Sequence, residues 1–197
     1  LASVTASAIS RIFLGNQATF IFGDLSIGTY SHFYFYAILG VLSGFISLMF
    51  IRYSEIIDNL FHEKILIKFP RWIVMTFAGL LMGIFGFYFK GIFGIGYDTI
   101  NSILASSQIW HVVLILLILK FFLVPIVLYS GGFGGIFAPS LFIGACVGYL
   151  YSFGLNHFFG IQLDTVAYVL VGMGAVLGGI NTIPISAILI IFEMKKN

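Results

Sequence analysis

The residues best placed for chemistry lie in a glycine-rich run, Ser130-Gly-Gly-Phe-Gly-Gly-Ile-Phe-Ala-Pro-Ser140, which interrupts apolar sequence on both sides. Between Lys120 and Asp164 the sequence contains no Asp, Glu, Lys or Arg. A ligand bound to this run would therefore meet only backbone groups and neutral side chains. No lysine follows the glycines, so the run is not a phosphate-binding P-loop. The chemistry that remains is the binding of an ion by main-chain dipoles.

The direction of these dipoles favours an anion. We expect an apolar helix to begin near Gly135, and the first N–H groups of a helix have no acceptor within it. These donors attract an anion, as does the partial positive charge of a helix N-terminus. Pro139 in the opening turn removes no hydrogen bond that the helix needs, and glycines let an ion approach the backbone. The predicted anion-binding N–H groups are those of Gly135, Ile136, Phe137 and Ala138. The predicted loop-forming residues are Ser130, Gly131, Gly132, Gly134 and Pro139.

The alternative interpretation of the run is a flexible hinge between two helices. Irregular backbone at membrane depth is tolerated only where it is buried in protein or lines a cavity. The two interpretations differ in whether the free N–H groups meet a ligand.

The composition identifies a lipid bilayer as the surroundings of this run. The 197 residues are 60% hydrophobic and 8% charged, whereas soluble domains carry roughly a quarter charged residues. The net charge of +2, without a basic cluster, excludes a nucleic-acid surface. The single cysteine and the four histidines lack the spacing of metal ligands, so we expect no metal and no cofactor. Neither a nucleophile–base pair nor clustered carboxylates indicate an intramembrane enzyme.

Apolar segments place the run within a series of membrane helices. A spanning helix needs about 20 apolar residues, because a core of roughly 30 Å is crossed at about 1.5 Å per residue. Four segments approach this length, namely Phe33–Ile51, Trp72–Phe89, Ile109–Tyr129 and Ile136–Phe153. Val166–Ile180 and Ile183–Phe192 are shorter and are separated at Pro184, and Leu1–Leu14 could be the end of a further helix. Short helices with glycine-rich breaks are typical of transporters whose broken helices meet near the midplane.

Small residues four apart predict close contacts between these helices. The pairs are Gly40/Gly44, Gly79/Gly83, Gly144/Gly148 and Gly174/Gly178. Such pairs let helix backbones approach closely in lipid, where no hydrophobic effect drives them together. We therefore predict an all-α multi-spanning membrane protein of tilted and broken helices.

The few charged residues indicate the topology. Basic residues outnumber acidic ones between Arg52 and Arg71, so we expect this segment to be a cytoplasmic loop. The polar segment Asn16–Ser31 suits the opposite face, and Lys90–Ser107 is predicted to be a loop leading into a short helix. Lys120 lies inside an apolar helix, where a charge is costly. It either snorkels or bonds to carbonyls within the bundle, or it is a fixed positive charge that raises the local anion concentration.

Two motifs resemble the CLC family of chloride channels and chloride/proton exchangers. The first is S-G-x-x-G-G-x-F-x-P, matched by Ser130, Gly131, Gly134, Gly135, Phe137 and Pro139. The second runs from Gly172 to Met194 as G-M-G-A…P-I-S-A…E-M. Lys120 falls where many members of this family carry a basic residue. Phe133 and Gly134 replace the usual small-residue and proline pair, and Thr182 replaces a frequent arginine.

The resemblance implies a fold, a ligand and a partner. It implies that residues 1–197 form part of one CLC-type transmembrane domain with inverted repeats and about eight helices. We expect this domain to be truncated at both ends and the chain to contain no soluble regulatory domain. The first amides of the helix, at Ile136 and Phe137, would hold a central chloride. A homodimer would form through Leu1–Leu14 and Pro184–Met194, in a membrane that we expect to be the bacterial inner membrane. The family's first serine loop, gating glutamate and inner tyrosine have no counterpart in the sequence.

Several functions remain open at this point. The chain could belong to a chloride channel or to a chloride/proton antiporter, of which we slightly favour the antiporter. The physiological anion could be chloride, nitrate or fluoride, with chloride as the default. A transporter of another small solute with a similar broken-helix architecture is the alternative. Glu193, next to Lys195 and Lys196, is expected to be an interfacial anchor.

Overall fold

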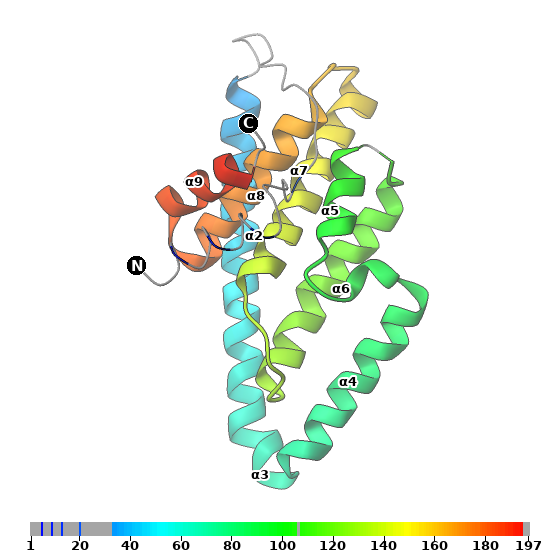
Figure 1. Ribbon diagram of the computed structural model, residues 1–197, viewed down its shortest axis with the longest axis vertical. Coiled ribbons are helices and arrows are strands. Elements are labelled where there is room, and N and C mark those ends of the chain that lie inside the picture. The colour runs from blue at the N-terminus through cyan, green and yellow to red at the C-terminus, as the bar shows by residue number, and fades with distance from the viewer. Residues whose placement is uncertain are drawn as a thin grey trace.

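The first half of the structure is one long helix followed by a second helix that runs back. The structure, a computed structural model, describes residues 33–105 and 107–194 together with Thr5, Ile9, Phe13 and Phe20. Helix α2 (Phe33–Leu60) continues through a π-helical turn (Phe61–Ile65) into α3 (Leu66–Lys68). After a break at Pro70, α4 (Arg71–Tyr88) returns toward the other end (Figure 1). The predicted segments Leu1–Leu14 and Asn16–Ser31 lie outside the described residues, apart from the four single positions above.

The prediction of a loop between Arg52 and Arg71 is wrong, because most of this segment is helical. Its charges form pairs one turn apart, with Arg52 and Glu55 at 3.3 Å and His62 and Asp58 at 2.9 Å. Such pairs support a helix that leaves the apolar zone. The helix ends only at Phe69, which Pro70 holds in an extended conformation (φ −124°, ψ 138°).

The second half contains the predicted helices close to their expected positions. A 3-10 turn (Lys90–Ile92) and α5 (Tyr97–Leu104) confirm the predicted loop and short helix. The remaining helices are α6 (Trp110–Tyr129), α7 (Phe137–Phe159), α8 (Thr165–Asn181) and α9 (Pro184–Met194). Helix α7 extends six residues beyond its predicted end at Phe153. Among the described residues, four helices are long and apolar enough to cross a membrane, namely Phe33–Lys68, Arg71–Tyr88, Trp110–Tyr129 and Phe137–Phe159.

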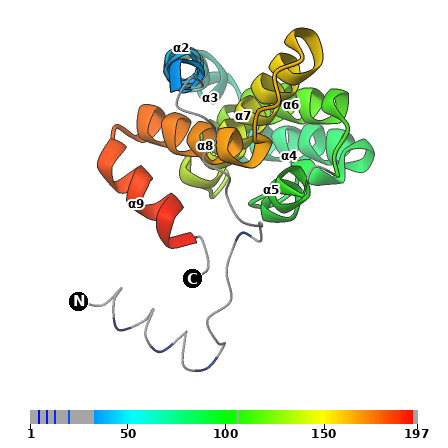
Figure 2. The ribbon, with the colours of Figure 1, turned by 90° about the horizontal axis from the view of Figure 1, so that it is seen from above.

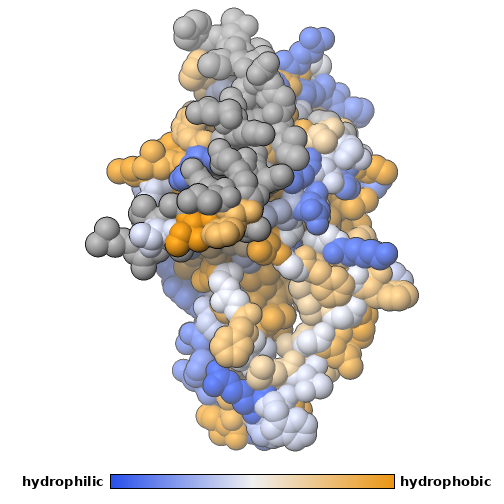
Figure 3. Space-filling model, in the orientation of Figure 1, coloured by the Kyte–Doolittle hydropathy of each residue, from blue (hydrophilic) through white to orange (hydrophobic). Residues whose placement is uncertain are grey.

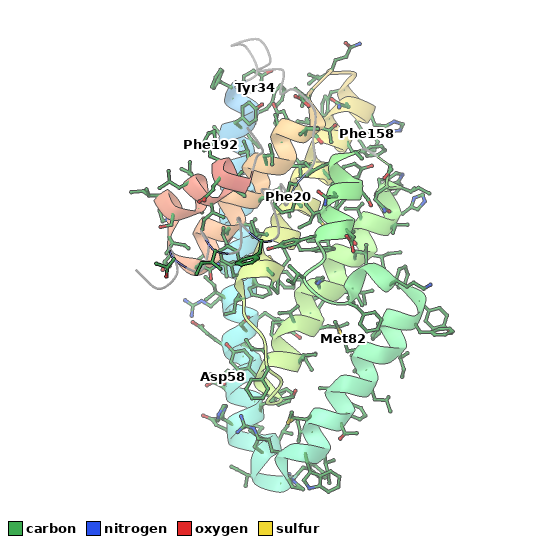
Figure 4. All side chains as sticks on the ribbon, in the orientation of Figure 1. Phe20, Tyr34, Asp58, Met82, Phe158 and Phe192 are labelled. Carbon is green, nitrogen blue, oxygen red and sulfur yellow. The ribbon has the colours of Figure 1, made fainter. Side chains whose placement is uncertain are left out.

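Helices α2, α5, α6 and α8 pack against α7, and α7 begins inside the bundle rather than at its end. The chain turns at the end of α6 and runs back as an extended segment before α7 starts near the middle of the molecule (Figure 1). Seen from above, α8 lies between α2 and α9 (Figure 2). Asp58 lies toward one end of the molecule, and Tyr34 and Phe158 lie near the other (Figure 4). Apolar side chains make up much of the visible surface, and hydrophilic ones gather at the upper right and the lower left with a few between them (Figure 3). The position of α7's first turn is therefore intermediate along the bundle.

Close packing of α7 on α8 uses one of the predicted glycine pairs. A Cβ on Gly144 would lie 2.5 Å from the Gly172 carbonyl oxygen and 2.6 Å from Met173 Cα. A Cβ on Gly148 would collide with the backbone of Tyr168. Gly178 in turn lies against α9, where an added Cβ would be 3.1 Å from Pro184 Cα. Both C-terminal glycine pairs therefore lie at helix contacts, as predicted.

The prediction is wrong for the two N-terminal pairs within the described residues. A Cβ on Gly40, Gly44, Gly79 or Gly83 would meet nothing within 4 Å. The spacing of small residues puts them on one face of a helix, but it does not specify which neighbour that face meets.

We predict that alanine at Gly144 and at Gly40 has opposite effects on stability. Gly144→Ala forces Cβ into the backbone of α8, which we expect to lower the free energy of unfolding by about 1–3 kcal/mol. Gly40→Ala meets no atom and removes a poor helix former, so stability should be unchanged or rise by up to about 1 kcal/mol. Thermal unfolding of the purified protein in detergent measures both, and equal midpoints for the two variants would contradict the α7–α8 packing.

Candidate functional site

The glycine-rich run begins as a tight turn that ends α6. Ser130 is the C-terminal cap of α6, and its Oγ donates to the Val127 carbonyl at 2.8 Å. The N–H of Gly132 also donates to Val127 O, at 3.1 Å. Gly131 adopts φ 106°, a conformation that favours glycine. The predicted loop-forming residues Ser130, Gly131 and Gly132 thus reverse the chain direction.

The four glycines of the run have two different roles. An added Cβ would lie 2.7 Å from Arg71 Nε at Gly131 and 2.7 Å from the Val127 carbonyl oxygen at Gly132. At Gly134 it would meet one methyl group at 3.9 Å, and at Gly135 it would meet nothing within 4 Å. The turn therefore requires glycine at positions 131 and 132. The second pair leaves the main chain accessible to a ligand.

Helix α7 begins two residues later than the sequence predicts. Ile136 is the N-terminal cap and Phe137 is the first helical residue, so Gly135 belongs to the loop. Pro139 is the third helical residue and contributes no N–H. Within the described part of the chain, no group accepts a hydrogen bond from the N–H groups between Phe133 and Ala138. The structure thus brings the predicted donors of Ile136, Phe137 and Ala138 together as free groups.

The residues that carry these free donors are not fully buried. Gly134 and Gly135 are exposed, and the four residues from Ile136 to Pro139 are partly buried. Ser140, one residue further, is fully buried. The residues with unpaired N–H groups are therefore the exposed and partly buried ones of the run. An anion is the ligand that such a group of donors binds.

Lys120 lies in the bundle interior and does not snorkel. Its side chain is 2% exposed, and its Nζ donates to the Gly94 carbonyl at 2.9 Å. The ammonium also lies 4.8 Å from the centre of the Phe142 ring, in the second turn of α7. The predicted bond to a carbonyl within the bundle is thus present, and it is compatible with the second interpretation, a fixed positive charge near an anion. The contact ties the loop before α5 to the first turns of α7.

Sequence reasoning missed two residues near the run. Arg71, at the first position of α4, lies against Gly131, although the sequence indicated only its contribution to topology. Asn181, at the last position of α8, donates to Ser140 Oγ at 3.3 Å. The sequence did contain a clue to Asn181, because a polar amide side chain is unusual within an apolar segment. Glu193 is exposed in the last turn of α9, and Lys195 and Lys196 lie outside the described residues.

The fold and the site together define an all-α membrane protein in which one helix begins inside the bundle with unpaired N–H groups at its start. Comparison with known proteins then identifies the family. The family model described as voltage gated chloride channel matches residues 1–197. The chain therefore belongs to the voltage-gated chloride channel, or CLC, family.

Individual relatives come from bacteria and plants. The chain is 29% identical over 195 residues to a putative chloride channel protein, ClcB-like, of Ralstonia nicotianae. It is 28% identical over 198 residues to the voltage-gated ClC-type chloride channel ClcB of Escherichia coli, and 30% identical over 216 residues to chloride channel protein CLC-e of Arabidopsis thaliana. The alignments cover 98–100% of this chain, but 45%, 46% and 30% of the Ralstonia, Escherichia and Arabidopsis proteins. The chain thus spans half or less of the length of these relatives.

We predict that alanine substitution separates the two pairs of glycines. Gly132→Ala places Cβ against the Val127 carbonyl, so we expect a loss of about 1–3 kcal/mol of stability. Gly135→Ala meets no atom within 4 Å, and its stability should stay within about 0.5 kcal/mol of the parent. Thermal unfolding in detergent provides the comparison. A Gly135→Ala variant as unstable as Gly132→Ala would show that the second pair is also required by the turn.

Proposed function

We propose that this chain provides the anion-binding loop of a protein that carries chloride across a membrane, as a CLC-type channel or chloride/proton antiporter. The main observation is the group of free N–H donors of Ile136, Phe137 and Ala138 at a helix start inside the bundle. Gly135 supplies a fourth N–H from the loop. Chloride is the transported ligand, and no cofactor takes part. The bacterial relatives support a place in a bacterial inner membrane.

The electrostatics of the site support a main-chain mechanism. A hydrogen bond to a charged partner contributes about 1.5–3 kcal/mol, so three or four such donors discriminate strongly for an anion. The partial positive charge of the α7 N-terminus acts in the same direction. The sequence between Lys120 and Asp164 contains no Asp, Glu, Lys or Arg. The anion is therefore bound without a charged side chain, which would hold it too tightly for transport.

Lys120 adds a positive charge behind the site in this proposal. Its ammonium contacts the ring of Phe142, which lies five residues after Phe137, or about 7.5 Å along the helix axis. The ammonium of Lys120 also donates to the Gly94 carbonyl, which is a neutral group. A buried cation with neutral partners raises the local anion concentration without closing the site as a direct ligand would.

We predict that deleting one N–H weakens chloride binding, whereas truncating the side chain beside it does not. Ile136 has φ −83°, close to the proline range, and the residue before it is a glycine, so Ile136→Pro fits the backbone. The loss of a charge-assisted hydrogen bond should weaken chloride binding about ten- to hundredfold. Ile136→Ala keeps the N–H, and its affinity should stay within about tenfold of the parent.

Calorimetric titration of chloride into the full-length protein in detergent measures these affinities. Thermal midpoints for both variants serve as the control for folding. Equal losses of affinity in Ile136→Pro and Ile136→Ala would refute binding by the backbone.

The proposed homodimer has support in the surface of α9. Four apolar side chains on this helix are more than half exposed, Ile185, Ile188, Leu189 and Phe192. Their spacing places them on one helix face. Figure 2 shows α9 at the margin of the bundle, on the opposite side from α4. A second copy of the protein would cover this face, together with the segment Leu1–Leu14.

We predict that a cysteine on this face crosslinks between subunits. Ile188 is 54% exposed, whereas its neighbour Ala187 is fully buried, so Ala187→Cys is a matched control. Cys146 is buried and should not react. In membranes containing the full-length protein without other reactive cysteines, Ile188→Cys should form a covalent dimer on oxidation and Ala187→Cys should not. Monomers from both variants would contradict an interface through α9.

A further inference from the structure

A chain of hydrogen bonds connects the end of α8 to the first peptide group of α7. The Ile136 carbonyl accepts two bonds from Ser140, from the backbone N–H at 2.9 Å and from Oγ at 2.6 Å. Asn181 Nδ2 then donates to Ser140 Oγ at 3.3 Å. Ser140 is fully buried. The bonds therefore form one path from Asn181 through Ser140 to Ile136.

The chemistry of the groups fixes the direction of each bond. Asn181 Nδ2 also lies 3.2 Å from the Leu177 carbonyl oxygen, which can only accept, so the amide nitrogen must face both partners. The Ile136 carbonyl can likewise only accept, so the single hydroxyl proton of Ser140 is directed to it. The lone pairs of Ser140 Oγ remain for Asn181. The Asn181 amide, the Ser140 hydroxyl and the Ile136 carbonyl thus have one consistent assignment of donors and acceptors.

This path determines the direction of an N–H group in the anion site. The Ile136 carbonyl and the Phe137 N–H belong to one planar trans peptide group, in which they point in opposite directions. Two hydrogen bonds from Ser140 hold the carbonyl along α7, toward its C-terminus. The Phe137 N–H must consequently point out of the helix start, toward the accessible part of the run.

We propose that Asn181 is a positioning residue for the anion, acting through Ser140 on the Phe137 N–H. The proposal rests on the proposed function, because it assumes that this N–H binds the anion. It assigns a role to the junction between α8 and α9, since Asn181 is the last residue of α8 and α9 begins at Pro184. The orientation of a main-chain donor in α7 is then controlled by a side chain of α8, through a hydrogen bond between residues 41 positions apart, Asn181 and Ser140.

The experiment measures chloride affinity by calorimetry, and the chloride-to-nitrate flux ratio in liposomes, with the full-length protein. Ser140→Ala removes the bond from Oγ to the Ile136 carbonyl and should weaken chloride binding about three- to tenfold. Asn181→Leu keeps a similar volume and should weaken it about two- to fivefold. The double variant should bind as Ser140→Ala does, within about twofold, because Asn181 acts only through Ser140. Ser140→Thr keeps a hydroxyl and should retain most of the affinity and the parent flux ratio.

Ser152→Ala provides the matched control in the same helix. Ser152 is also fully buried, and its Oγ donates to the Tyr149 carbonyl at 3.0 Å, three residues back in the helix. We expect this variant to keep the chloride affinity and the flux ratio of the parent. Thermal midpoints identify any variant that fails to fold, and Asn181→Leu tests the path if Ser140→Ala is such a variant.

The outcomes separate this inference from the proposed function. Parent-like affinity in Asn181→Leu, or effects of Ser140→Ala and Asn181→Leu that add fully in the double variant, would overturn the positioning role and leave the anion site intact. An equal loss in Ser152→Ala would also overturn it. Absence of chloride binding in the parent protein would overturn the proposed function and this inference together.

Discussion

The absence of water from the bilayer core is the constraint on which this structure depends. Every backbone N–H and C=O group at that depth needs a partner within the protein, in a cavity or on a ligand. Helix α7 begins inside the bundle and presents unpaired N–H groups there. The turn of Gly131 and Gly132 brings the chain back from the end of α6, and so produces a helix start part-way along the bundle. Such unpaired groups would be costly in lipid, and in the proposed function they are the donors that bind the anion.

The packing around α7 keeps this helix start in place. Gly144 and Gly172 bring the backbones of α7 and α8 into contact, so α7 cannot slide or rotate without a collision between main chains. Lys120 holds the loop before α5 against Phe142. Asn181, at the end of α8, contacts Ser140 in the first turn of α7. Closely packed protein interiors transmit small displacements. These contacts therefore fix the direction of the N–H groups at the start of α7 as well as the position of α7.

Helix positions could be predicted from the sequence, whereas their contacts could not. The boundaries of α4 and α6 follow from the apolar length, and they agree with the prediction within one residue. The extension of α2 into the charged segment was missed, because pairs such as Arg52 and Glu55 stabilise a helix that has left the apolar zone. The glycine loop was found through local composition and the family signature. Its connection to Asn181 joins residues 41 positions apart, and only the tertiary structure brings them together.

The proposed anion site needs more donors than this loop supplies. The idealised cost of moving an ion into a low-dielectric interior is of order 20 kcal/mol. Three or four N–H groups, at about 1.5–3 kcal/mol each, recover less than about two thirds of it. Water and donors from other elements must supply the remainder, and they need access to the same side of the ion. Gly134 and Gly135 do not pack against the other described helices, so groups from outside this chain can reach the proposed site from their side. A loop fully enclosed by its own helices would bind the anion too weakly to compete with water, because it would exclude the groups that complete the coordination.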